Sequence, residues 1–410
     1  MKISHPDSVL KGELSIAGSK SESNRALMIQ AYMGQKCDLT NLSDSNDTRL
    51  LSKLLDEIES SAENLIHTID CADAGTVCRF LLTFLAQKKG KWLLTGTERL
   101  NKRLIAPLVE SLRQLGADLS YVQKEKELPI IIKGVKLKPC DVEIDASQSS
   151  QFVSSLLLLL PMLQLPIQLK LVGKPSSLPY IDMTIAMMNH FGAKVSRVDN
   201  VINVLPSEYV PKRFVVSPDW SSASYWLEAV ALGKECNLVL KNFTDISMQG
   251  DSAVVGMFRH LGVSCSFSEE GLVIKKVGDV ADNLNFDFLN CPDLFPSVVT
   301  TCAALNKKAV LSGVRNLQYK ESDRVGAMVE ELSKMGAEFT ACPDCIILEK
   351  GIDAQKSPIF SSHNDHRIAM ALSMLALKCP SVEIIGTDAV KKSYLNFWSD
   401  MYLLGFELEA

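Results

Sequence analysis

Residues 219–233 read DWSSASYWLEAVALG, and this stretch decides the fold. Asp219 and Ser221 offer side-chain oxygens that can cap the free N–H groups at the start of a helix. Residues 223–232 are then apolar on nearly every face, and Gly233 is a residue type that commonly ends a helix. Because a helix that is apolar all round must be covered on all sides, we expect it to lie at the centre of a domain.

The same unit recurs along the chain. This helix is followed by a predicted strand at residues 237–241, an amphipathic helix at 252–261 that ends at Gly262, and a half-buried strand at 263–267. Similar apolar segments open at steps of 54, 74, 72, 73 and 70 residues, at Ser21, Gly75, Ser149, Ser221, Leu294 and Asn364. Glycines end the amphipathic runs in the same phase, at Gly116, Gly192, Gly262, Gly336 and Gly405. A fixed period of this length predicts stacked copies of one α/β unit.

The length of 410 residues predicts two domains of three units each, since single cores stop growing below this size. In each domain the buried helices would lie inside and the sheets outside. Short strands separated by helices would also fit one doubly wound sheet. The order of elements leaves that alternative open.

Composition excludes several classes of protein. A hydrophobic content of 47%, a charged content of 22% and a net charge of −5 indicate a soluble globular protein without a broad nucleic-acid surface. The longest apolar run, residues 152–167, is too short to cross a membrane because Pro161 and Pro166 interrupt it. The start of the chain has no apolar signal region, which favours a cytoplasmic protein.

Eleven cysteines are scattered through the chain and are expected to be reduced thiols. The one close pair, Cys342 and Cys345, has no nearby histidines or second pair, so we interpret it as a turn between strands. The pattern requires neither a metal nor an organic cofactor.

The openings of the buried helices carry polar residues suited to anions. A helix N-terminus presents free N–H groups and the positive end of the helix dipole, and it therefore attracts phosphates and carboxylates. Any one of these openings taken singly is well explained as an ordinary N-cap. Lys20, Arg25 and Arg367, however, oppose the dipole at a cost in local stability, which invites a functional explanation. A P-loop is excluded at residues 12–20 because its glycine spacing and the position of Lys20 do not fit.

Five of these motifs together resemble the EPSP synthase (3-phosphoshikimate 1-carboxyvinyltransferase) family. They occur in the family's order at residues 18–25, 74–76, 149–152, 320–324 and 365–367. The resemblance implies a two-domain inverse α/β barrel. Each domain would have three βαββαβ repeats whose buried parallel helices point to an interdomain cleft. It also implies an N-terminal domain at residues 19–217 and a C-terminal domain at 1–18 plus 218–410.

The same resemblance implies a reaction that needs neither a metal nor a cofactor. We expect the protein to be a monomer. The enolpyruvyl group of phosphoenolpyruvate would be transferred to the 5-hydroxyl of shikimate 3-phosphate by addition and elimination, releasing phosphate. Shikimate 3-phosphate would contact Lys20, Ser21, Arg25, Ser149, Ser150, Gln151, Ser177, Tyr180, Asp293, Asn316 and Lys320. Phosphoenolpyruvate would contact Lys20, Gly75, Arg99, Gln151, Arg324, Arg367 and Lys392.

Asp293 would act as the base and Glu321 as the acid, with Lys20 touching both substrates. Lys391 is an alternative to Lys392 at the last position. Two other functions remain open: transfer of enolpyruvate to UDP-N-acetylglucosamine, and phosphometabolite binding without catalysis. The first is less favoured because Ser21 follows Lys20 where that family has asparagine. Glyphosate is expected to compete with phosphoenolpyruvate.

Overall fold

The computed structural model describes residues 1–61 and 65–409. The chain forms two compact units. We call Lys20–Ser43 with Asp47–Val216 the N-terminal unit, and Met1–Ser19 with Asp44–Asn46 and Ser217–Ala410 the C-terminal unit. The first residues of the chain therefore belong with the last ones.

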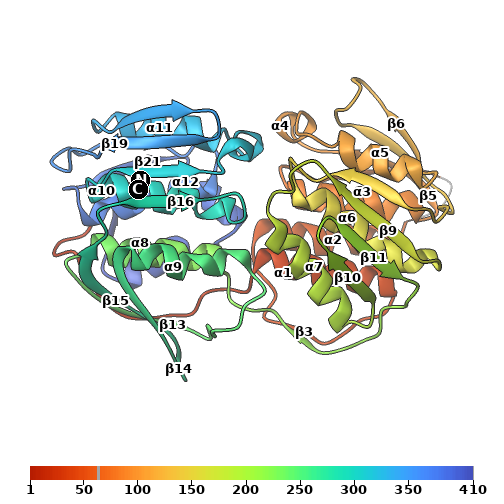
Figure 1. Ribbon diagram of the computed structural model, residues 1–410, viewed down its shortest axis with the longest axis horizontal. Helices are drawn as coiled ribbons and strands as arrows, with labels where there is room; N and C mark the ends of the chain where they lie inside the picture. Colours follow the sequence, from red (N-terminus) through yellow and green to blue (C-terminus); the bar gives the residue numbers. More distant parts are fainter. Residues whose placement is uncertain (62–64, 410) are drawn as a thin grey trace. The chain divides into compact units, whose positions relative to one another are not determined.

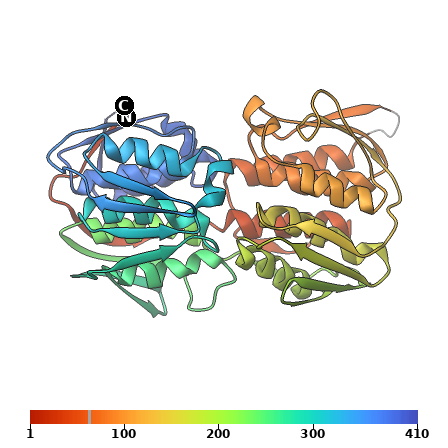
Figure 2. The same cartoon turned by 45° about the horizontal axis from the view of Figure 1, so that its top comes forward.

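Five sheets in the described part of the chain share one strand order (Figures 1 and 2). In each, a first strand lies parallel to a second, which is also antiparallel to a third, and the third is antiparallel to a fourth. The third and fourth strands form a hairpin in four of these sheets, whereas in the last they are β1 and β22 from opposite ends of the chain. The sheets are β4-β5-β7-β6 and β8-β9-β11-β10 in the N-terminal unit, and β2-β13-β15-β14, β16-β17-β19-β18 and β20-β21-β1-β22 in the C-terminal unit. Separate mixed sheets rule out the doubly wound alternative.

The elements of the N-terminal unit follow the predicted repeat. Its helices are α1 (Lys20–Met33), α2 (Asn46–Glu59), α3 (Gly75–Gln87), α4 (Glu98–Asn101), α5 (Ala106–Gln114), α6 (Ser150–Leu159), η1 (Leu160–Leu163) and α7 (Leu178–His190). Its strands are β3 (Leu39–Thr40), β4 (Ile66–Asp70), β5 (Gly90–Thr95), β6 (Asp118–Tyr121), β7 (Ile130–Gly134), β8 (Val142–Asp145), β9 (Ile167–Val172), β10 (Lys194–Val198), β11 (Val201–Leu205) and β12 (Phe214–Val215). The first repeat is reduced, because β3 and β12 alone pair beside α1 and α2.

The C-terminal unit contains three full copies. Its helices are α8 (Trp220–Leu232), η2 (Gly250–Ala253), α9 (Val254–Arg259), η3 (Pro292–Leu294), α10 (Phe295–Ala304), η4 (Arg315–Tyr319), α11 (Arg324–Ser333), α12 (His366–Ser373), η5 (Met374–Leu377), η6 (Thr387–Lys392) and α13 (Phe397–Leu403). Its strands are β1 (Lys2–Ser4), β2 (Val9–Leu14), β13 (Glu235–Lys241), β14 (Leu261–Ser268), β15 (Gly271–Val280), β16 (Leu284–Asp287), β17 (Ala309–Ser312), β18 (Glu338–Cys342), β19 (Cys345–Lys350), β20 (Ile359–Ser361), β21 (Val382–Ile385) and β22 (Glu407–Glu409). Since β1 pairs with both β21 and β22, the two termini lie side by side (Figure 1).

The helix predicted from residues 219–233 is α8, and every one of its residues is buried. The Asp219 carboxylate accepts a hydrogen bond from the Ser222 backbone N–H at 2.8 Å and so caps its start. Helix α8 packs against α10, which in turn packs against α12. The helix starts of this unit therefore carry Asp219, Asp293 and Arg367 on neighbouring elements.

One helix end was predicted wrongly. Helix α9 ends at Arg259, and Gly262 lies inside β14 rather than after the helix. Gly262 has the left-handed φ of 81° that we expected, but it serves an irregularity of the β14–β15 pair between Leu261 and Val263. The amphipathic pattern runs across this boundary and therefore hid it.

The expectation that all cysteines are reduced was also wrong. Cys342 and Cys345 form a disulfide across the turn between β18 and β19, where a turn was predicted.

No helix in the described part of the chain has the length and the apolar character that a bilayer crossing requires.

Candidate functional site

In the C-terminal unit, the buried Arg324 guanidinium contacts three carboxylates. Its Nε donates to Asp365 Oδ2 at 2.8 Å, its Nη1 to Asp293 Oδ1 at 2.7 Å and its Nη2 to Glu321 Oε2 at 2.8 Å. Burial alone would lower the pKa of Arg324, but these three acids outweigh it and hold that pKa above its ordinary value. Arg324 is thus a permanent cation that brings both predicted proton-transfer residues together.

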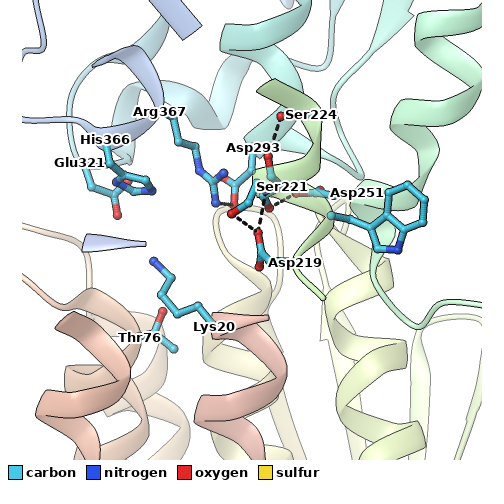
Figure 3. A network of polar contacts seen from close by, with 12 residues as sticks. Lys20, Thr76, Asp219, Ser221, Ser224, Asp251, Asp293, Glu321, His366 and Arg367 are labelled. Atoms are coloured by element: carbon cyan, nitrogen blue, oxygen red, sulfur yellow. Dashed lines mark hydrogen bonds and ion pairs between the residues drawn. The ribbon is translucent and has the colours of Figure 1, made fainter. Parts of the chain in front are cut away.

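Asp293 is shared by Arg324 and Arg367, and Figure 3 shows the Arg367 side of this pair. Its second oxygen accepts a hydrogen bond from Arg367 Nη2 at 2.6 Å. Burial raises the pKa of Asp293, but Arg367, Arg324 and Lys320 together hold it well below the ordinary range. Asp293 is therefore ionised and a weak base while both arginines contact it.

A further group of polar residues in the same unit was missed from the sequence. Ser221, near the start of α8, donates a hydrogen bond to the buried Asp251 (Figure 3). Burial and, to a smaller extent, the charge of Asp293 raise the pKa of Asp251 to about 7, against the opposing effects of Arg367 and of the Ser221 hydrogen bond. Ser221 was noted only as a helix opening. Asp251 lies in no motif, so nothing local could have identified it.

In the N-terminal unit, Arg25 is buried and held by neutral groups. Its Nε donates to Thr184 Oγ1 at 2.7 Å, while Nη2 donates to Ser154 Oγ at 3.0 Å and to the Tyr180 carbonyl at 3.3 Å. Its Nη1 donates to the Ser21 carbonyl at 2.8 Å. Burial lowers the pKa of Arg25 to about 10, so it remains charged at neutral pH. Each of these hydrogen bonds goes to a neutral oxygen, and the carboxylate of Glu22 acts on the guanidinium only through its charge, so an anion can bind without displacing a hydrogen-bonded carboxylate.

Lys20, the first residue of α1, makes an ion pair. Its Nζ lies 3.3 Å from the Asp47 carboxylate, which is buried at the start of α2. The ion pair therefore holds the Lys20 ammonium beside the start of α2. Asp47 was not predicted because it lies 27 residues from Lys20 in the chain.

A second cationic group surrounds the start of α3. Arg79 donates a hydrogen bond to the Gln151 side-chain oxygen, and Gln151 Nε2 donates to Thr76 Oγ1 at 3.0 Å. A Cβ built on Gly75 would lie 2.6 Å from Arg103 Nη1 and 3.0 Å from Arg79 Nη1. Glycine lets two guanidinium groups approach the backbone at this position, and a side chain would push them aside.

A family model described as EPSP synthase (3-phosphoshikimate 1-carboxyvinyltransferase) matches residues 5–401, which is nearly the whole chain. The chain belongs to the EPSP synthase family. It is 37% identical over 406 residues to a 3-phosphoshikimate 1-carboxyvinyltransferase of Bacteroides fragilis, covering 98% of this chain and 97% of that one. A relative of the same description from Vibrio campbellii is 32% identical, with 97% and 98% covered.

Solved structures confirm the predicted fold class for this EPSP synthase family member. An EPSP synthase of Acinetobacter baumannii superposes with a TM-score of 0.79 at 23% identity, over 100% of this chain and 99% of that one. The enolpyruvyl transferase NikO of Streptomyces tendae has a TM-score of 0.76 at 14% identity, over 99% and 97%. At these identities the superpositions speak for the fold alone.

Apart from Lys392, which is the last residue of η6, the predicted residues of the family motifs lie within or just before the first two turns of helices in both units. In the N-terminal unit these are Lys20, Ser21 and Arg25 of α1, Gly75 of α3, Ser149, Ser150 and Gln151 at the start of α6, and Ser177 and Tyr180 at the start of α7. In the C-terminal unit they are Asp293 of η3, Asn316 of η4, Lys320 and Glu321 just before α11, Arg324 of α11, Arg367 of α12 and Lys392 of η6. Ser177 has a left-handed φ of 56°, which is uncommon for a serine.

Arg99 is the exception to this grouping. It is exposed on the short helix α4, whereas Arg103, four residues later, has its guanidinium beside Gly75. Arg79 and Arg103 are therefore the guanidinium groups at the start of α3. No spacing rule in the sequence identifies Arg79 or Arg103 as site residues. Arg103 is one of the two arginines in residues 98–105, just before α5.

The two C-terminal lysines differ in burial. Lys392 is 6% exposed. The Lys391 side chain is 52% exposed and pairs with Asp388 at 2.6 Å. Because the Lys392 side chain is buried, its ammonium has little access to solvent and is stabilised more by an anionic ligand than that of Lys391 would be.

In the described part of the chain, Glu330, Glu331 and His363 have ligand atoms within 4.8 Å of one another, the spacing a metal ion would need. The Glu331 oxygens, however, already accept hydrogen bonds from Lys334 Nζ at 2.6 Å and the Ser361 N–H at 3.1 Å, and one lies 2.7 Å from His363 Nε2. An ion would have to displace these contacts.

Proposed function

We propose that two groups of residues act together on phosphoenolpyruvate and shikimate 3-phosphate and transfer the enolpyruvyl group from the first to the second. The N-terminal group comprises the predicted site residues of the N-terminal unit, and the C-terminal group comprises those of the C-terminal unit. Membership of the EPSP synthase family over almost the whole chain supports this activity. The observation that carries the assignment of roles is the sharing of Asp293 by Arg324 and Arg367, with Glu321 on the same guanidinium. An acid and a base then lie beside cations that can hold a phosphate and a carboxylate.

The N-terminal group holds shikimate 3-phosphate in this proposal. Arg25 carries its charge among neutral acceptors, so an incoming anion needs no carboxylate to leave. The hydroxyls of Ser149, Ser150 and Ser177 supply further donors for phosphate oxygens, and Tyr180 packs on the ring. Asn316 and Lys320 of the C-terminal unit complete the contacts.

Phosphoenolpyruvate is held chiefly by Arg324, Arg367 and Lys392, with Lys20 contacting both substrates. At the start of α3 we assign Arg103 in place of the predicted Arg99, because it is the guanidinium that lies against Gly75. We assign Lys392 rather than Lys391 because Lys391 is exposed and already paired with Asp388. Gln151, which contacts both Arg79 and Thr76, orients the cations at this position.

The reaction then proceeds in two stages. In the first, Asp293 takes the proton of the 5-hydroxyl, and the hydroxyl oxygen bonds to C2 of phosphoenolpyruvate. Glu321, protonated once the substrate anions occupy Arg324, delivers its proton to the methylene carbon. In the second, the C2–O bond to phosphate breaks as Asp293 returns its proton to the departing phosphate, and the Glu321 carboxylate takes a proton from the methyl group, which restores the double bond. Each stage needs one group to donate a proton and another to accept one.

The contacts of the C-terminal group indicate how the base becomes active. Asp293 is a weak base as long as Arg324 and Arg367 neutralise it. When substrate phosphate and carboxylate groups take over those arginines, the pKa of Asp293 rises towards the ordinary range of a carboxyl group. Substrate binding would thereby switch on the base only when a proton can be transferred.

The test is phosphate release by the purified protein. We expect release with phosphoenolpyruvate and shikimate 3-phosphate together and none with either alone. Release with phosphoenolpyruvate and UDP-N-acetylglucosamine instead would establish the other transferase activity. Binding of shikimate 3-phosphate without release under any combination would establish a non-catalytic protein. A monomeric state and a cytoplasmic location remain predictions from the sequence.

A further inference from the structure

The hairpin of β18 and β19 carries a disulfide at a place where pairing does little for stability. Cys342 and Cys345 are opposite each other in the register of the two strands, and only Pro343 and Asp344 lie between them. The ladder already holds these strands together, and so short a loop gains least from cross-linking. Stabilisation of the hairpin therefore does not account for this disulfide, whereas a role in thiol–disulfide exchange would.

Both sulfur atoms belong to partly exposed residues. Cys342 and Cys345 are intermediate in exposure, and Pro343 and Asp344 between them are exposed. By contrast, Cys71, Cys78, Cys236, Cys291, Cys302 and Cys379 are buried and free. A thiol in solution can therefore reach the paired cysteines, which is the first requirement for exchange.

The tip of the hairpin is tied to the segment that carries the proposed acid. The Gly313 N–H donates to the Asp344 carbonyl at 3.1 Å, and the Arg315 N–H donates to Asp344 Oδ1 at 3.4 Å. Ser312 of β17 is in register with Cys345. The next residues in the chain are η4, Lys320 and Glu321, so Asp344 braces the backbone from which these side chains extend.

The same turn also touches the segment that leads to Asp293. Gly313 has a left-handed φ of 69°, and a Cβ on it would collide with the Asp287 carboxylate and with the Leu289 backbone. The Phe288 N–H donates to the Ser312 carbonyl at 2.9 Å. A shift of the hairpin tip would thus act on the start of both segments that carry proposed proton-transfer residues.

We propose that Cys342 and Cys345 are a reversible thiol–disulfide site that a small or protein dithiol reduces, and that its state tunes the position of residues 316–321. A thiolate of the dithiol attacks one sulfur, breaks the S–S bond and forms a mixed disulfide. Its second thiol then displaces the remaining cysteine. Two electrons and two protons pass from the dithiol to Cys342 and Cys345, and the dithiol leaves as its own disulfide.

The modification is tested by thiol labelling, which does not require the protein to be active. The native full-length protein is equilibrated with oxidised or reduced dithiothreitol, alkylated, and its peptides are identified by mass spectrometry. We expect Cys342 and Cys345 to be labelled only after reduction, while the exposed free Cys140 is labelled in both states. Labelling of the pair in the oxidising buffer, or resistance of the pair to dithiothreitol, would overturn the proposal.

The effect on the site is a second measurement and rests on the proposed function. Reduction, and the Cys342→Ser/Cys345→Ser double variant, should each raise the KM for shikimate 3-phosphate by about twofold to tenfold, the range expected for one ordinary hydrogen bond. Cys140→Ser is the matched control and should leave the KM of either redox form unchanged. Equal KM values for the oxidised protein, the reduced protein and the double variant would refute the coupling. A protein without activity in any form would instead refute the proposed function.

Discussion

Replacement of Gly75 by alanine tests how the start of α3 binds an anion. The new Cβ would lie 2.6 Å from Arg103 Nη1 and 3.0 Å from Arg79 Nη1. Ordinary carbon–nitrogen contact needs roughly 3.5 Å, so the Arg103 guanidinium must move by about 1 Å. That movement removes or weakens one hydrogen bond to a charged ligand, which is worth about 1.5–3 kcal/mol.

This loss corresponds to a rise of about 10-fold to 150-fold in the KM for phosphoenolpyruvate. The KM for shikimate 3-phosphate should change much less, because Arg25 lies among other partners. Stability should also change little, since the atoms that yield are the ends of flexible side chains. Steady-state kinetics with each substrate varied in turn and a thermal melt measure all three quantities.

Gly256→Ala is the matched control. Gly256 lies in α9, has no atom within 4 Å of a built Cβ and has no left-handed φ. Alanine there should leave both KM values unchanged and stabilise the protein by up to about 1 kcal/mol. An unchanged KM for phosphoenolpyruvate in Gly75→Ala, or an equal rise in Gly256→Ala, would show that the start of α3 does not bind phosphoenolpyruvate in this way.

Four further predictions concern other residues. Glu321→Gln should lower kcat by about 100-fold to 10,000-fold with smaller changes in binding, and near-normal turnover would remove Glu321 from proton transfer. Lys392→Met should raise the KM for phosphoenolpyruvate while Lys391→Met does not; the reverse pattern would show that the exposed lysine is the ligand. Asp251 has a folded-state pKa raised to about 7, so its ionisation makes stability fall as pH rises from about 4 to about 7. Asp251→Asn should therefore gain in melting temperature over the parent protein between pH 5 and pH 8, and a difference independent of pH would contradict this. Glyphosate should raise the apparent KM for phosphoenolpyruvate, and a constant value during its titration would exclude competition.

The repeat and the chemistry of the helix starts could be predicted from the sequence. Helix α8 was recognisable because its capping residue, its apolar faces and its final glycine lie within 15 residues. The same local signals placed Lys20, Gly75, Ser149 and Arg367 at helix starts. Signals that lie within one helix, such as its cap, its apolar faces and its final glycine, can be recognised without knowing the fold.

Residues that act through distant partners could not be predicted in this way. Asp47 pairs with Lys20 across 27 residues, and Asp251 contacts Ser221 across 30. Arg103 was passed over for Arg99 because both lie in one short segment, and only the fold shows which guanidinium reaches Gly75. The disulfide depends on strand register, which places Cys342 opposite Cys345 and is not visible in their spacing.

A crystal structure of the Glu321→Gln variant with both phosphoenolpyruvate and shikimate 3-phosphate bound would show directly whether Arg324 and Arg367 exchange Asp293 for substrate anions. We expect shikimate 3-phosphate within hydrogen-bond distance of Arg25 and Ser149, and phosphoenolpyruvate on Arg324 and Arg367 with Asp293 released from at least one of them. Substrates bound elsewhere, with Arg324 and Arg367 still on the Asp293 carboxylate, would contradict this expectation.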